Sequence, residues 1–91
     1  MAEISVTAAG DDVYEVTVRE PEGQTEHRVT MTADDVAWLG VDAAPTLILE
    51  ESLRFLMERE PKEAILARFD LRTIARYFSD YREAMRRRLG E

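Results

Sequence analysis

Cysteine is absent from this sequence, and histidine, lysine and tryptophan occur once each. Without cysteine the chain has no disulfide, no thiol nucleophile and no thiolate metal site, which suits a reducing cytosol. The unbroken apolar runs, such as Leu47-Ile48-Leu49, are far shorter than the roughly 20 residues that a membrane-spanning helix needs. Met1 is followed by Ala, Glu and Ile rather than by a basic stretch and an apolar core, so we expect no secretory signal and a cytoplasmic location.

The usual sequence signatures of catalysis and metal binding are also missing. The four glycines are scattered, which excludes a glycine-rich phosphate loop. The acidic pairs consist of adjacent residues, whose side chains diverge on a strand or helix, and no HExxH or EF-hand spacing occurs. His27 lies on an expected strand, and Ser5 or Thr7 would lie near it only in a particular sheet register. We interpret His27 as structural and expect no enzyme, no cofactor and no metal.

The chain has the composition of a folded globular domain. Its 91 residues are 45% hydrophobic and 34% charged, and this length suits a single domain spanning residues 1–91. Residues 3–32 contain three segments in which apolar and polar residues alternate, centred on Val6, Val16 and Val29. Turn residues at Gly10-Asp11-Asp12 and Glu20-Pro21-Glu22-Gly23 separate these segments. The pattern predicts a three-stranded antiparallel meander.

Helices are expected throughout residues 33–89. Thr32 is a favourable N-cap for a short helix over 33–39, which Gly40 ends, and Pro45 suits the first position of a helix over 45–60. A third short helix is expected over 61–68, and Asp70 is expected to cap a long helix over 71–89. Strands followed by helices predict an α+β fold, in which three to four helices pack on one face of the sheet.

The expected helix over 71–89 has a regular apolar stripe with spacings of three and four residues. The stripe consists of Leu71, Ile74, Phe78, Tyr81 and Met85. Such a stripe is typical of a helix that packs on its own core, and the same spacing matches the seam of a coiled-coil dimer. We favour the core and therefore a monomer, with a dimer through this helix as the alternative.

Residues 61–91 are basic although the chain as a whole is acidic. Residues 1–60 contain four arginines and 14 acidic residues, a net charge of −10, whereas residues 61–91 contain eight basic and five acidic residues, a net charge of +3. Most of these basic residues lie opposite the apolar stripe of the last helix. The candidate interaction surface comprises Arg72, Arg76, Arg82, Arg86 and Arg87.

The arginines near the carboxyl end have a structural explanation, because cations stabilise the end of a helix. Arg72 and Arg76 have no such explanation. Acidic residues such as Glu50, Glu51 or Glu58 are the expected partners if their charges are neutralised within the protein. If they remain free, the asymmetry of charge could steer a partner protein. We therefore expect a non-catalytic protein-interaction or regulatory module that uses the arginine-rich helix.

Nucleic-acid binding is the alternative function. Residues 61–68 and 71–89, joined at Phe69-Asp70, resemble a helix-turn-helix in outline, which would place Arg72 and Arg76 at the start of a recognition helix. A net charge of −7 opposes the attraction to phosphates that dominates DNA affinity.

The segment Phe55-Leu56-Met57-Glu58-Arg59-Glu60-Pro61-Lys62-Glu63, together with Phe69-Asp70-Leu71 and Ile74-Ala75-Arg76-Tyr77-Phe78, resembles a pattern in a family of small uncharacterised bacterial proteins. The resemblance covers the second half of the chain and implies no catalytic residue.

Overall fold

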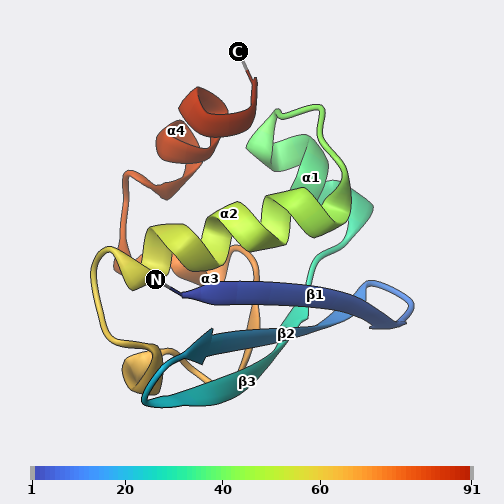
Figure 1. Ribbon diagram of the computed structural model, residues 1–91. Helices are drawn as coiled ribbons and strands as arrows, with labels where there is room; N and C mark the ends of the chain where they lie inside the picture. Colours follow the sequence, from blue (N-terminus) through green and yellow to red (C-terminus); the bar gives the residue numbers. More distant parts are fainter. Residues whose placement is uncertain (1, 91) are drawn as a thin grey trace.

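The computed structural model describes residues 2–90 and has an α+β architecture with one mixed sheet (Figure 1). The four strands lie in the order of the sequence, β1-β2-β3-β4. Their bounds are Glu3–Gly10 (β1), Val13–Glu20 (β2), Gly23–Thr30 (β3) and Arg68–Asp70 (β4). The strands β1 to β3 form the predicted antiparallel meander, and the sheet gains β4 on its far side.

The helical part of the chain is divided into more and shorter elements than the sequence predicts. The α-helices are α1 (Ala33–Leu39), α2 (Pro45–Met57), α3 (Thr73–Tyr77) and α4 (Tyr81–Met85). A 3₁₀ helix, η1, spans Lys62–Ala64, and a π-helical turn, η2, spans Arg86–Gly90. Figure 1 shows α2 between the sheet and the pair formed by α1 and α4.

The alternation of residues along the meander separates a buried face from an exposed one. Val16 lies opposite His27, and both side chains are buried on the face that α2 covers. Glu15 lies opposite Arg28 on the other face, and the two side chains form an ion pair. The predicted packing of the helices on one face of the sheet follows from this pattern.

The start of the helical region matches its sequence signals closely. The Thr32 hydroxyl accepts a hydrogen bond from the Asp35 amide at 3.1 Å, and the Asp35 carboxylate accepts one from the Thr32 amide at 2.9 Å. This reciprocal capping box fixes the first turn of α1. Gly40 ends the helix with φ of 74°, the left-handed conformation that favours glycine.

The prediction of a helix over residues 61–68 is wrong. Only η1 is helical there, and the chain then extends and pairs with β3 in a parallel arrangement. The Arg28 amide donates to the Ala67 carbonyl at 2.7 Å, and the Leu71 amide donates to the Thr30 carbonyl at 2.9 Å. A parallel neighbour needs a long crossover, which α1 and α2 provide.

The continuous helix over 71–89 is also wrong, as is the Asp70 cap. Asp70 belongs to β4, and α3 begins at Thr73 without a side-chain cap. The chain becomes extended at Phe78 before α4 begins. Four residues of the apolar stripe are nevertheless buried, namely Leu71, Ile74, Tyr81 and Met85. Within residues 2–90 these four residues of the stripe therefore pack in the core, as favoured from the sequence.

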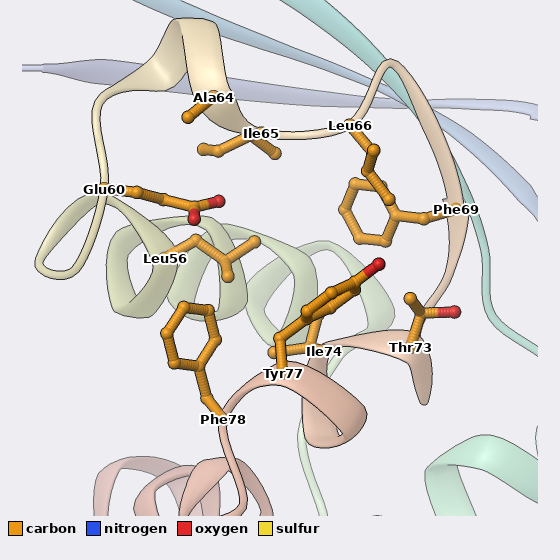
Figure 2. A pocket seen from close by; sticks show the side chains of 10 residues that line it. All are labelled: Leu56, Glu60, Ala64, Ile65, Leu66, Phe69, Thr73, Ile74, Tyr77 and Phe78. Carbon is orange, nitrogen blue, oxygen red and sulfur yellow. The ribbon is translucent and has the colours of Figure 1, made fainter.

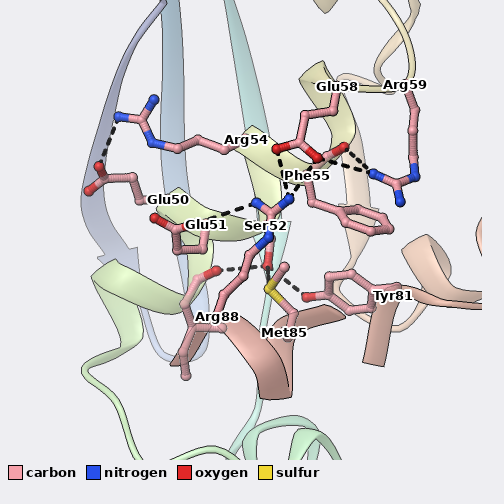
Figure 3. Close-up of polar contacts among 11 residues, drawn as sticks. Glu50, Glu51, Ser52, Arg54, Phe55, Glu58, Arg59, Tyr81, Met85 and Arg88 are labelled. Carbon is pink, nitrogen blue, oxygen red and sulfur yellow. Dashed lines mark hydrogen bonds and ion pairs between the residues drawn. The ribbon is translucent and has the colours of Figure 1, made fainter. Parts of the chain in front are cut away.

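A buried hydrogen-bond chain joins α2 to α4, as Figure 3 shows in part. The Ser52 hydroxyl donates to the Ile48 carbonyl at 2.7 Å, and it accepts from the Tyr81 hydroxyl at 2.6 Å. The Tyr81 ring packs edge-on against Phe55, with ring centroids 5.4 Å apart. Burial raises the pKa of the Tyr81 hydroxyl well above its usual range, so this group remains a proton donor.

The helix α2 ends at Met57, with Glu58 as its cap, three residues before the predicted end. Among the described residues, no helix combines the length and the apolar character that crossing a membrane requires.

The hydrogen bond between Ser52 and Tyr81 can be tested by a double-mutant cycle. We expect Ser52→Ala to lower the free energy of unfolding by about 1–3 kcal/mol, because it leaves the buried Tyr81 hydroxyl without a partner. Tyr81→Phe should cost about 0.5–1.5 kcal/mol, because Ser52 still donates to Ile48. The double variant should cost less than the sum of the two in urea unfolding. Additive costs would show that the bond contributes nothing to stability.

Candidate functional site

Most of the basic residues are neutralised within the protein. Within residues 2–90, eight of the 12 lysines and arginines form an ion pair with a carboxylate. They are Arg19, Arg28, Arg54, Arg59, Lys62, Arg72, Arg87 and Arg88. Three of them, Lys62, Arg72 and Arg88, pair with carboxylates of residues 1–60 and so join the basic part of the sequence to the acidic part.

Three arginines of the predicted interaction surface hold α1 in place. The Arg72 guanidinium lies 2.9 Å from the Asp35 carboxylate, so its partner is in α1 and not among the predicted glutamates of α2. Arg82 donates to the Trp38 carbonyl at 2.7 Å, and Arg86 donates to the Leu39 carbonyl at 2.8 Å. These carbonyls lie at the carboxyl end of α1, which attracts cations. The guanidinium groups of Arg72 and Arg82 also lie 5.1 and 5.3 Å from the Trp38 ring centroid.

Two further arginines connect α2 to the carboxyl-terminal part of the chain. Arg88 donates to both oxygens of Glu58, at 2.6 and 2.7 Å, and it also lies 3.5 Å from Glu51 (Figure 3). The hydrogen bond from Arg88 lowers the pKa of Glu58. Arg59 lies 3.6 Å above the Phe55 ring and donates to Asp80 at 2.8 Å. These contacts clamp α4 and η2 to α2.

The segment between α2 and β4 is attached to the sheet by two buried polar side chains. Lys62 is 2% exposed and donates to Glu20 at 2.7 Å, and this hydrogen bond raises the pKa of the lysine. His27 is 3% exposed, and its ring nitrogens lie 2.7 Å from the Leu66 carbonyl and 2.9 Å from the Thr25 hydroxyl. His27 thus ties this segment to β3. Ser5 and Thr7 cannot reach it, because they lie on the opposite face of the sheet.

Two arginines differ from the other basic residues, because each lacks both a carboxylate partner and a carbonyl acceptor in the described part of the chain. Within residues 2–90, Arg68 and Arg76 form no ion pair and no hydrogen bond to a carbonyl. Arg76 shares a hollow with the carboxylates of Asp34 and Asp70. Arg68 lies directly opposite Arg28 on the exposed face of the sheet, which is an unfavourable pairing of like charges.

An apolar pocket lies under β4, as Figure 2 shows. Its volume is about 180 Å³, and it is bounded by η1, β4, α3 and the end of α2. Leu66, Phe69 and Tyr77 point toward one another at its rim (Figure 2). Leu66 is 48% exposed and Tyr77 is 69% exposed. Two large apolar side chains thus flank one opening.

Two shallow hollows with charged side chains in their lining adjoin the pocket. One shares Leu66, Phe69 and Thr73 with it and also contacts Arg68, and the other continues from Thr73 to Arg76. Both unpartnered arginines therefore lie beside the apolar pocket. We call this continuous surface the β4 groove, and its defining residues are Leu66, Arg68, Phe69, Asp70, Thr73, Arg76 and Tyr77.

The backbone of β4 is open along this groove, because β4 is the last strand of the sheet. The hydrogen bonds of Ala67 and Leu71 to β3 fix the alternation of peptide groups along the strand. The peptide groups of Arg68 and Asp70 accordingly point away from β3. The side chains alternate as well: those of Arg68 and Asp70 lie on the exposed face, and that of Phe69 lies on the face with the pocket.

Of the five arginines predicted to form an interaction surface, Arg72 and Arg76 line the hollow at one end of the β4 groove, and of these two Arg72 is paired with Asp35. Arg72, Arg82 and Arg86 bind α1, and Arg87 forms an exposed pair with Glu83 at 3.7 Å. Within residues 2–90 no group of three or more His, Asp or Glu side chains is placed to hold a metal ion.

No family model, curated protein or solved structure matches this chain.

Because Arg68 and Arg28 carry like charges on neighbouring strands, we predict that reversing the charge of Arg68 stabilises the fold. We expect Arg68→Glu to raise the free energy of unfolding by about 0.2–1 kcal/mol, because a repulsive cross-strand pair becomes attractive. Arg87→Glu is the matched control, since it also lowers the net charge by two. It should lower the stability by about 0.2–0.5 kcal/mol, because it places two glutamates four residues apart on a helix. Urea unfolding of both variants measures the effects. Equal changes of one sign would contradict the assigned register.

Proposed function

We propose that this protein is a protein-interaction module and that the β4 groove binds a segment of a partner protein. The proposal is based on one observation: three features that suit the binding of a peptide lie together on the same surface. Leu66 and Tyr77 are exposed around an apolar pocket. In the part of the chain that the structure describes, the outer backbone of β4 is unpaired, and Arg68 and Arg76 lack partners. Apolar anchors surrounded by polar groups are typical of protein interfaces.

The dimensions of the pocket favour a side chain of a protein over a cofactor. Sites for drug-sized ligands usually have volumes of about 300–1,000 Å³, whereas this pocket has about 180 Å³. That volume suits one large apolar side chain, which anchors a segment that continues along β4. Grooves beside an edge strand bind peptides in this manner in several classes of domain.

Little supports the nucleic-acid alternative. The predicted helix-turn-helix pair over 61–68 and 71–89 is not formed, because the first segment is a 3₁₀ turn followed by β4. Arg72, which that alternative would place on DNA, is paired with Asp35. The net charge of −7 also opposes association with a polyanion.

The proposal predicts that the protein selects peptides through the groove. Random 12-residue peptides displayed on phage would be selected on the wild-type protein and then measured on Leu66→Asp/Tyr77→Asp. Both positions are exposed, so the variant should fold, which circular dichroism can verify. We expect the affinity to fall at least about tenfold, because the anchor loses its apolar contacts.

Leu47→Asp serves as a control, since Leu47 is 41% exposed on α2 and does not line the groove. It should leave the binding of the selected peptides unchanged. Failure to enrich any peptide, or peptides that bind Leu66→Asp/Tyr77→Asp as tightly as the wild type, would refute the proposed function.

A further inference from the structure

We infer that the partner segment adds to β4 as a further strand and carries an acidic residue next to its apolar anchor. This inference rests on the proposed function and specifies the chemistry of the ligand. It follows from the order of side chains across the sheet and from the peptide groups that β4 leaves unpaired.

The exposed face of the sheet contains a row of charged side chains that ends at β4. Glu15 lies opposite Arg28, and Arg28 lies opposite Arg68. Glu15 and Arg28 form an ion pair, so Arg28 has its carboxylate on the β2 side. The residue directly opposite Arg68 on β3 is a cation, and Arg68 forms no ion pair within residues 2–90. On an added strand, an acidic residue is therefore stabilised most at the position next to Arg68, because opposite charges on neighbouring strands attract.

The neighbouring positions of the added strand are determined by the same alternation. A residue opposite Phe69 lies on the face with the pocket, where Leu66 and Tyr77 leave an apolar opening. A residue opposite Asp70 returns to the exposed face and meets a carboxylate that has no ion pair within residues 2–90. The expected ligand therefore has an acidic residue, a large apolar residue, and a basic or neutral residue at three consecutive positions.

The backbone of β4 can pair with an added strand at the two positions on either side of Phe69. The peptide groups of Arg68 and Asp70 point outward and can each exchange hydrogen bonds with an incoming strand. In peptide recognition by edge strands, such main-chain bonds supply affinity and the alternating side chains supply specificity. The charges at Arg68 and Asp70 also discourage unselective pairing. A strand with complementary charges removes that barrier.

A charge exchange at Arg68 tests the inference. Phage-displayed 12-residue peptides would be selected in parallel on the wild-type protein and on Arg68→Glu. We expect an acidic residue beside the apolar anchor in the first set and a basic residue at that position in the second. Fluorescence anisotropy of the labelled peptides should show that Arg68→Glu weakens wild-type ligands at least about fivefold, because an attractive pair becomes repulsive.

Two comparisons make the result specific. Replacing the acidic residue of the peptide by lysine should restore binding to Arg68→Glu, and Arg87→Glu, with the same change in net charge, should bind the original peptide normally. Peptides that need Leu66 and Tyr77 but show no preference for charge would overturn this inference and leave the proposed function intact. A selection that yields no peptide on either protein would overturn both and identify the charges of β4 as edge protection only.

Discussion

The architecture depends on the pairing of β4 with β3. This parallel contact is formed by only three residues of β4, yet it determines where the second half of the chain lies. Lys62 and His27 hold the segment before it through a partly buried ion pair with Glu20 and a hydrogen bond to the Leu66 carbonyl. The chain is extended through Asp70 in β4, and the next helix begins at Thr73 rather than at Leu71. The break in the predicted helix and the opening beside Tyr77 both follow from this arrangement.

Local patterns in the sequence predicted the elements that local interactions stabilise. The meander has alternating residues and turn signals, and α1 has a capping box and Gly40, so the structure agrees with both predictions. β4 was missed because three residues give too short an alternation to recognise. Its pairing also depends on contacts with residues about 40 positions earlier. The charged–apolar–charged order of Arg68, Phe69 and Asp70 was the only local signal.

The candidate site was predicted only in part, for a related reason. The apolar stripe indicated burial correctly although its helix is broken, since hydrophobic residues are buried whichever backbone presents them. The sequence could not show which arginines stabilise the fold and which are available to a partner, because this depends on groups that are distant in the sequence. Arg82 and Arg86 bind carbonyls at the end of α1, whereas Arg68, which was expected in a helix, lies on the open edge of the sheet. Only the fold distinguishes structural arginines from available ones.

Hydrogen exchange of the backbone amides of β4 tests the central claim most directly. The account predicts that the Phe69 and Leu71 amides exchange slowly in the free protein, because both face β3, and that those of Arg68 and Asp70 exchange fast. Adding a selected peptide should slow exchange at Arg68 and Asp70 and leave the other two unchanged. Fast exchange at all four amides would contradict the pairing of β4 with β3. Protection of Arg68 and Asp70 in the free protein, or no change on binding, would contradict the open edge and its use for strand addition.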